Sequence, residues 1–485
     1  MFKSLNINSK SGYFILLSGI FICNLILKIS FLGAEPFWYD EIVSVKATLI
    51  DFGHIKHMSE WDNNPPFYYY CLWVWAKMFG ISEFNVRLLS VLFSSVSVCL
   101  LFHFLKKHYN ILTGLFGALL FSFHGFSYEY SHEARCYSLV VLLVILSTIC
   151  FFHALEKKTF LSVFWLGLVN FLVIYTHYIA GLILFFQLVL VLIYKRDFIK
   201  QFGISIAILL LFVLLRFTKK QFLVMLSFNK EGKTFWLQTA DSNSLKEALA
   251  NLFFGETVWL IFLTVFFISL AATFILRKKN SKDQNLVLVY SVYLSVMCIA
   301  LTYFIGMFKP IFLARYILFT VPFILILISH FLSNINKLIA LLVIPLVCLA
   351  IYSANLNPSK PMDFKLASLV VKRLQENKKP MILIQTKDVT ALFAYYFDIS
   401  YFKDYKNLTN NLKNHKVFEL ENKSDLSGLP FTGENTIIFC QTFEKQDDSN
   451  QIFDIFKQNN FVFKTTKGVK GVKISLLRKI EFYEK

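Results

Sequence analysis

Residues 130–158, YSHEARCYSLVVLLVILSTICFFHALEKK, contain the pattern that decides the fold of this chain. The segment opens with polar and aromatic residues, continues with an apolar run at 137–155, and ends at Lys157 and Lys158. A helix needs about 20 apolar residues to cross a bilayer, and basic residues gather on the cytoplasmic side of a membrane. The segment therefore predicts a transmembrane helix with a polar outer end and a basic inner end.

The same pattern recurs along most of the chain and predicts a mainly α, polytopic helical bundle. Of the 485 residues, 56% are hydrophobic and 16% are charged, and mean hydropathy is +0.56. Soluble proteins contain about 25% charged residues, so most of this chain is expected to lie in lipid. We expect about eleven spans, near 12–32, 85–105, 111–127, 137–155, 159–176, 178–194, 201–217, 252–276, 284–305, 315–333 and 337–354.

The net charge of +18 does not indicate a nucleic-acid-binding protein. The basic residues are dispersed, and no nucleic-acid motif accompanies them. In a membrane protein, Lys and Arg collect in cytoplasmic loops and near anionic lipid headgroups. The cysteines show neither a CxxC pair nor an even-spaced framework, so a zinc site or a disulfide scaffold is not indicated.

The basic residues also predict the orientation of the bundle. With the N-terminus inside, every inner connection is short and basic, for example at Lys106 and Lys107 or at Lys195 and Arg196. The long outer connection at 218–251 breaks the rule, because it contains several lysines. Long loops obey the rule poorly. An odd number of spans leaves the C-terminus outside.

The chain changes character after residue 355, which predicts two domains, 1–354 in the membrane and 355–485 outside it. The second part is lysine-rich and polar, and it follows a linker with two prolines. Alternating and helical patterns within it predict a small extracytoplasmic α/β domain. We expect strands near 381–384, 436–439, 461–466 and 470–477, the last two paired as a hairpin around 467–469, and helices at 364–375 and 451–458.

Five polar segments fall on the predicted outer side of the membrane. Ionisable residues at this boundary are costly and often functional. Arginine and lysine together suit a phosphate, aromatic rings suit sugars and isoprenoid chains, and a carboxylate can act as general base toward a hydroxyl. The segments are Asp40–Glu41, 61–70 with Asn64-Pro65-Pro66, 128–137 with Glu133-Ala134-Arg135, 175–178 with His177, and 309–316 with Arg315-Tyr316.

The order and common sidedness of these motifs resemble the GT-C type membrane glycosyltransferases over about residues 10–350. The nearest branch is the protein O-mannosyltransferase and aminoarabinose (lipid A) transferase group. The segments Phe235-Trp236-Leu237-Gln238 and Leu252-Phe253-Phe254-Gly255 are also similar to that group. The resemblance implies an inverting transfer of one sugar from a polyprenyl-phosphate donor at the outer face of the membrane.

The resemblance also implies roles for individual residues. Asp40 is similar to the catalytic base that takes the acceptor's proton, Glu41 shares that role or holds the acceptor, and Glu133 is similar to the second acidic position. Arg315 is similar to the cation that holds the departing lipid phosphate. The expected substrate-binding residues are Asn64, Arg87, Arg135, Tyr137, His177, Lys219, Lys309, Arg315 and Tyr316. Some branches use a divalent metal held by Asp-x-Asp, and the Asp-Glu spacing here leaves metal dependence open.

The span pattern and this resemblance together lead us to expect a multi-pass inner-membrane hexosyl- or pentosyltransferase whose active site and C-terminal domain are periplasmic. Its expected partners are a polyprenyl-phosphate-linked sugar, membrane lipids and a hydroxyl acceptor in a glycan, lipid or protein of the cell envelope. No nucleic-acid partner is expected. The alternatives are a membrane transporter and a lipid-linked glycan flippase or ligase. A transporter would carry broken helices in corresponding halves, and the sequence shows no such symmetry.

Overall fold

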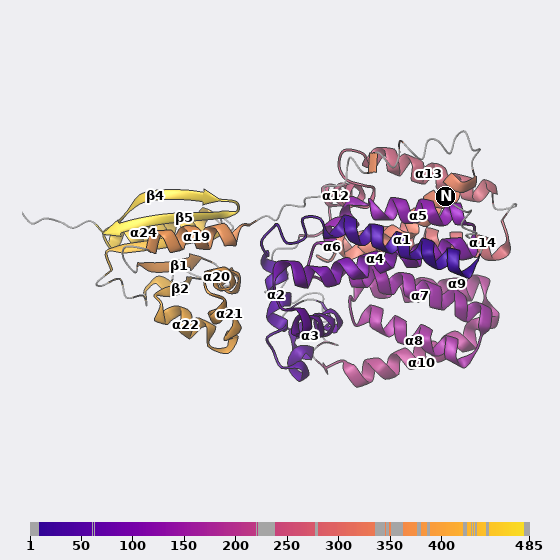
Figure 1. The fold of residues 1–485 in the computed structure, drawn as a ribbon, viewed down its shortest axis with the longest axis horizontal. Coiled ribbons are helices and arrows are strands. Elements are labelled where there is room, and N and C mark those ends of the chain that lie inside the picture. Colours follow the sequence, from indigo (N-terminus) through magenta and orange to yellow (C-terminus); the bar gives the residue numbers. More distant parts are fainter. Residues whose placement is uncertain are drawn as a thin grey trace, which may run out of the picture. The chain divides into compact units, whose positions relative to one another are not determined.

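The computed structural model divides the chain into two compact units (Figure 1). The first consists of Met1–Leu32, Asp51–Gly80 and Phe84–Asn357, and the second of Gly33–Ile50, Ile81–Glu83 and Pro358–Lys485. The structure describes residues 9–479 except 61, 63, 220, 222–237, 277–279, 335–344, 346–348, 351–361, 376–379, 386–388, 421–423, 428, 430, 432–433 and 443–445. Two segments of the predicted membrane domain, Gly33–Ile50 and Ile81–Glu83, therefore pack with the C-terminal unit.

The first unit is a bundle of apolar helices, as the sequence predicts. Several of these helices lie side by side, among them α8 with α7 and with α10 (Figure 1). The helices of this unit are α1 (Lys10–Ile29), η1 (Phe52–Glu60), α3 (Phe67–Phe79), α4 (Glu83–His108), α5 (Ile111–Ser122), α6 (Gly125–Ser131), α7 (Tyr137–Lys157), α8 (Phe160–Ile174), α9 (Leu182–Tyr194), α10 (Ile199–Arg216), α12 (Ser242–Leu252), α13 (Trp259–Leu276), α14 (Lys282–Val292), α15 (Cys298–Gly306), η5 (Ala314–Thr320) and α16 (Val321–Asn334).

Six helices of the described chain are long and apolar enough to cross a membrane, and a bent pair raises the number to seven. Three further apolar helices are shorter. The single span expected at 111–127 is instead the bent pair, α5 and α6, which turn by 62° at a short break. The span expected at 252–276 begins later, at Trp259, after the separate helix α12. Most of the span expected at 337–354 lies outside the described residues.

Local chemistry explains where these helices begin. Ser9, Asn110 and Thr159 each accept a hydrogen bond from a backbone N–H in the first turn of the helix that follows. Basic residues end α4 and α7, where positive charge complements the negative end of the helix dipole. The N-cap residues explain why the starts of these helices can be predicted from the sequence.

Four buried polar side chains connect four helices inside the bundle. Ser147 of α7 donates to Asn170 of α8 at 2.5 Å, and Asn170 donates to Gln187 of α9 at 2.9 Å. Gln187 in turn donates to Ser147 at 2.9 Å and to the hydroxyl of Tyr290 of α14 at 3.3 Å. We refer to Ser147, Asn170, Gln187 and Tyr290 as the core network. Hydrogen bonds between helices help to define how they pack where no water competes.

The second unit is built on a five-stranded sheet with strand order β2-β1-β3-β5-β4. Strand β1 pairs in parallel with β2 and β3, while β5 runs antiparallel to β3 and β4. Every residue of β1 is buried, so both faces of the sheet are covered at this strand. The strands are β1 (Met381–Gln385), β2 (Val417–Leu420), β3 (Thr436–Thr442), β4 (Phe461–Val469) and β5 (Val472–Lys479), and the helices α2 (Tyr39–Ala47), α19 (Phe364–Gln375), α20 (Thr390–Phe397), α21 (Ile399–Lys403), α22 (Leu408–Asn414), α23 (Ser424–Ser427) and α24 (Gln446–Gln458).

The prediction of a small α/β domain is confirmed, with one correction to its hairpin. The expected turn at 467–469 belongs to β4, and the chain reverses at Lys470 and Gly471. Gly471 has φ of +67°, a left-handed conformation that glycine adopts without strain. The pattern predicts both strands but not the bounds next to the turn: β4 extends to Val469 and β5 begins at Val472. The exposed residues of β4 show no alternation near its end.

Candidate active site

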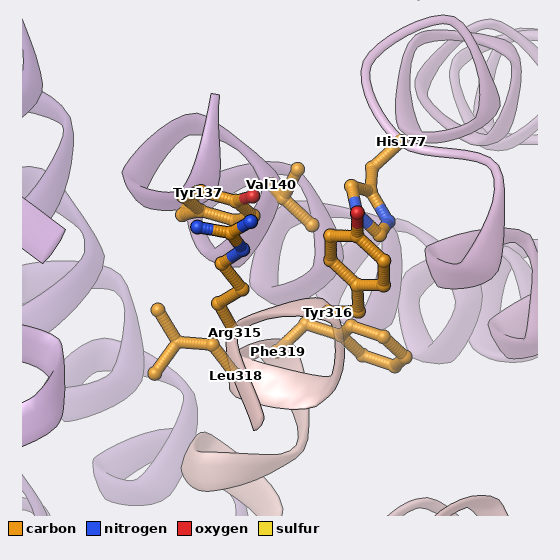
Figure 2. Close-up of a pocket in the computed structure, with 7 residues that line it drawn as sticks. All are labelled: Tyr137, Val140, His177, Arg315, Tyr316, Leu318 and Phe319. Carbon is orange, nitrogen blue, oxygen red and sulfur yellow. The ribbon is translucent and has the colours of Figure 1, made fainter. Parts of the chain in front are cut away.

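A small pocket in the first unit contains four of the residues predicted to bind substrate. Tyr137 comes from the start of α7, His177 from the turn after α8, and Arg315 and Tyr316 from η5. In Figure 2, Arg315 extends from η5 toward Tyr137, and the rings of Tyr316 and His177 lie next to each other. The pocket therefore joins three separate parts of the chain; Val140, Leu318 and Phe319 complete its lining.

The position of Arg315 follows from the helix that comes after it. Pro322 is the second residue of α16. The backbone N–H groups in the first turn of a helix have no acceptor within that helix, so a proline, which has no N–H, is tolerated there. Immediately before it, η5 presents Arg315 and Tyr316, with the guanidinium carbon 5.8 Å from the centre of the Tyr316 ring. The planar guanidinium lies in the pocket near this ring, and it is the group best suited to a phosphate or carboxylate.

His177 lies in a tight turn that is fixed to the start of α3. The backbone N–H of Phe67 donates to the carbonyl of Tyr175 at 3.1 Å. The imidazole packs on Tyr316, with ring centres 5.3 Å apart, and on Tyr137 at 6.1 Å. It is buried, and its Nδ1 atom has no hydrogen-bond partner within the described chain. One nitrogen of His177 is therefore available to a ligand of the pocket.

Burial lowers the pKa of His177 to about 4, and the positive charges of Arg135 and Arg315 act in the same direction. The negative charge of Asp62 opposes them and is outweighed. The imidazole is therefore neutral at physiological pH, and it can donate one hydrogen bond and accept another.

We predict that acid destabilises the chain partly through His177. Because its pKa lies below the ordinary value of about 6.5, the unfolded chain binds the proton first as pH falls. The contribution of His177 to the free energy of unfolding is fully present above pH 6.5 and is lost progressively toward pH 4. It amounts to about 3 kcal/mol. Thermal unfolding of His177→Asn between pH 7 and 4 should show a smaller loss of Tm than wild type.

His54 provides the control for this prediction, because its side chain is 70% exposed. The His54→Asn variant should lose as much Tm on acidification as wild type does. An equal loss of Tm in wild type and His177→Asn would contradict the prediction.

Asp62, which the sequence analysis did not include among the site residues, is the centre of a second polar cluster. Its Oδ2 atom accepts hydrogen bonds from Arg135 Nη1 at 2.8 Å and from the hydroxyl of Tyr69. Its Oδ1 atom accepts a bond from Asn64 Nδ2 at 3.4 Å. Burial raises the pKa of Tyr69 well above its ordinary value, so the phenol remains a donor. Asp62 thus connects two predicted substrate-binding residues, Asn64 and Arg135.

The pair of Asp62 and Arg135 is expected to contribute strongly to stability. Their side chains are only 12% and 5% exposed, and removing one partner of a buried ion pair is strongly destabilising. We predict that Asp62→Ala lowers the free energy of unfolding by about 3 kcal/mol. A fall in Tm would show this loss.

The exposed pair of Lys107 and Glu156 offers a matched control. It has a similar separation of 2.9 Å, but its side chains are 44% and 53% exposed. The Glu156→Ala variant should lower the free energy of unfolding by less than about 1 kcal/mol, because water screens an exposed ion pair. Equal falls in Tm for the two variants would refute the special role of Asp62.

The remaining predicted substrate-binding residues do not line the pocket. Lys219 and Lys309 are exposed. Arg87 is 1% exposed in α4 and donates to the carbonyl of Leu32 at 3.2 Å, so the chain itself uses at least part of this guanidinium. Glu133, which was predicted as the second acidic catalytic position, is 3% exposed, does not line the pocket and lies two residues before Arg135. The expected lysine cluster near Lys219 lies mostly outside the described residues, as does most of Phe235-Trp236-Leu237-Gln238.

Asp40 and Glu41 lie in the second unit, in the first turn of α2. Acidic residues are favoured there by the positive end of the helix dipole. Asp40 is half-buried, whereas Glu41 is fully buried and its Oε2 atom accepts a hydrogen bond from the N–H of Trp38 at 3.4 Å. The two adjacent carboxylates therefore differ: Glu41 helps to start the helix, and Asp40 retains contact with solvent.

The sequence contains one signal for Asp62, its place in a polar stretch beside a predicted site residue. Asp62 lies two residues before Asn64 and three before Pro65, in a polar stretch that we had singled out. Its partners lie 7 and 73 residues further along the chain, so only the folded bundle shows which acid of the stretch is buried. In the described part of the chain, no three His, Cys, Asp or Glu side chains are placed to hold a metal ion.

A bundle of apolar helices followed by a small α/β unit is the fold of the GT-C type glycosyltransferases, and this fold is confirmed. The structure is similar to that of ArnT from Cupriavidus metallidurans bound to undecaprenyl phosphate, with a TM-score of 0.62, 9% identity, and coverage of 96% of this chain and 98% of ArnT. The apo structure of ArnT gives a TM-score of 0.60 and 10% identity over the same shares.

A family model supports the same class from the sequence. Residues 63–218 match the model of the dolichyl-phosphate-mannose-protein mannosyltransferases. This range includes Asn64, Arg135, Tyr137 and His177. The sequence similarity to this family is therefore shown for residues 63–218, and the similarity to ArnT shows the fold. A comparison with the sequences of curated proteins finds no significant match.

Proposed function

We propose that this protein is a membrane glycosyltransferase that takes a sugar from a polyprenyl-phosphate donor and attaches it to a hydroxyl acceptor. The observation that carries the proposal is the pocket in which the Arg315 guanidinium lies beside the neutral imidazole of His177 and two tyrosines. Such a pocket suits a phosphate, because a fixed positive charge and neutral hydrogen-bond donors surround it. The ArnT structure of the same fold is bound to undecaprenyl phosphate, which supports this ligand class.

In the proposed reaction, Asp40 accepts the proton of the acceptor hydroxyl as its oxygen attacks the anomeric carbon. The bond between that carbon and the phosphate oxygen breaks, so the configuration inverts and polyprenyl phosphate departs. Arg315 offsets the charge that develops on the phosphate oxygen. His177 donates a hydrogen bond to the same phosphate. Arg135, held by Asp62, and Asn64 contact the donor.

We also propose that the reaction takes place on the outer face of the inner membrane. Basic residues end α4 and α7, which favours a cytoplasmic position for those ends. The start of α7, with Tyr137, and the turn containing His177 lie at the opposite ends of their helices. The C-terminal unit is then periplasmic, and the acceptor belongs to the cell envelope.

The proposal is tested by incubating the purified full-length protein in liposomes with a panel of polyprenyl-phosphate sugars and hydroxyl acceptors. We expect one donor to release polyprenyl phosphate, detected by mass spectrometry together with an acceptor whose mass has increased by one sugar. Protein-free liposomes and a polyprenol glycoside without phosphate should give no product. Movement of the donor across the bilayer without release of lipid phosphate would contradict the proposal and identify a flippase.

A further inference from the structure

The second unit contains more than the C-terminal chain. Its sheet and helices form one compact body with two segments from the part of the chain that connects α1 to α4, Gly33–Ile50 and Ile81–Glu83. The first of these segments contains α2 and therefore Asp40. Helix α20 of the C-terminal chain packs against α2. The carboxylate proposed as the general base is thus part of the C-terminal unit.

The contacts between these segments concentrate on two adjacent tyrosines of α20. The hydroxyl of Tyr396 accepts a hydrogen bond from the backbone N–H of Phe37 at 2.6 Å and donates to Glu83 Oε1 at 3.1 Å. The hydroxyl of Tyr395 donates to the carbonyl of Ile81 at 3.1 Å. The phenol of Tyr396 therefore joins the two ends of the connection between α1 and α4.

Packing supports these hydrogen bonds. Phe37 is fully buried, and its ring meets that of Tyr395 edge to face, with centres 5.2 Å apart. Burial, followed by the negative charge of Glu83, raises the pKa of Tyr396 far above its ordinary value, so the phenol keeps its proton. Two ion pairs, Lys470 with Glu35 at 3.1 Å and Lys365 with Glu83 at 3.9 Å, are partly exposed and contribute less.

The connection from Tyr396 to Asp40 is short. Phe37 is held by Tyr396, the next residue Trp38 is the N-cap of α2, and its N–H donates to Glu41. Asp40 is the second residue of that helix. The hydrogen bond from Phe37 to Tyr396 therefore helps to fix the start of α2, and with it the position of the Asp40 carboxylate.

We infer that Tyr396 is a positioning residue for Asp40, and that the C-terminal unit acts as the frame that holds the general base. This inference rests on the proposed function, and it assigns a role to the C-terminal unit. A base that is displaced by about 1 Å can lose a large part of its effect. Donor binding, which we assign to the pocket of the first unit, does not depend on this anchor.

The test is the variant Tyr396→Phe in the full-length protein. It keeps the ring and removes both hydrogen bonds of the phenol. We expect kcat for sugar transfer to fall about tenfold while KM for the polyprenyl-phosphate donor changes less than about twofold. Tyr401→Phe, which removes a partly exposed hydroxyl of α21 in the same unit, should leave both constants unchanged.

Hydrogen exchange separates positioning from loss of stability. In Tyr396→Phe, amides of residues 37–47 should exchange faster, and those of the β1–β5 sheet should not. An unchanged kcat, or faster exchange throughout the sheet, would overturn the inference. If wild type transfers no sugar at all, the proposed function fails instead. In that case, exchange at 37–47 still decides whether Tyr396 anchors this segment, and no change there overturns the inference.

Discussion

Substitution of Asp40 by asparagine is expected to reduce kcat for sugar transfer by roughly 10³-fold, the largest effect that we predict. Asparagine has the shape of aspartate, but it cannot take the proton of an attacking hydroxyl. Asp40 is half-buried at the start of α2, so the neutral amide should be accommodated without loss of folding. Released polyprenyl phosphate measured by mass spectrometry gives kcat, and donor binding measured separately should remain.

Asp51 is the matched control for Asp40, because it follows α2 on the same connection and its side chain is 78% exposed. We expect Asp51→Asn to turn over at the wild-type rate. Turnover of Asp40→Asn at the wild-type rate would remove the catalytic assignment. The neighbouring Glu41 is buried and caps α2, so we expect its removal to affect folding before it affects chemistry.

Replacement of Arg315 by alanine is expected to lower kcat/KM for the donor by roughly 10² to 10³-fold. The guanidinium lies in the pocket with Tyr137 and His177, and it is the cation proposed to offset the charge of the leaving phosphate. The effect should appear in both donor affinity and kcat, because the charge on the phosphate oxygen grows as the glycosidic bond breaks. Steady-state kinetics with varied donor concentration would measure it.

Three further variants test this role of Arg315. Arg315→Lys keeps the charge but loses the planar fork, so it should restore only part of the activity. Arg196→Ala removes an exposed arginine on a short connection between α9 and α10 and should have no effect. A loss in Arg87→Ala as large as that in Arg315→Ala would argue against a special phosphate role for Arg315.

Elements with a strong local pattern could be predicted from the sequence. Helix α19 begins and ends where predicted, at Phe364 and Gln375, because its apolar residues recur at helical spacing. The hairpin of β4 and β5 follows from two runs of strand-forming residues. The pocket residues His177 and Arg315 were recognisable because polar residues at the end of an apolar helix are expensive and therefore rare.

Features that depend on tertiary packing could not be predicted in the same way. The contact between Asp62 and Arg135 joins residues 73 positions apart, and no local pattern indicates which acid of a polar stretch becomes buried. Lys219 and Lys309 have the same residue type as a phosphate-binding lysine, yet both are exposed. The bend of 62° between α5 and α6 occurs in an apolar run that sequence periodicity reads as one helix.

The core network has a consequence for the pocket at the ends of its helices. Ser147 lies ten residues along α7 from Tyr137, and Asn170 lies seven residues before His177. A helix rises about 1.5 Å per residue, so each of the two polar residues is about 10–15 Å from the pocket along its helix. Lipid offers no hydrophobic penalty for one apolar helix sliding along another. A slip of α7 against α8 by one turn would move two walls of the pocket apart by about 5 Å and would break the bonds among Ser147, Asn170 and Gln187. The hydrogen bonds inside the bundle thus fix the alignment of the aromatic groups at the ends of α7 and α8.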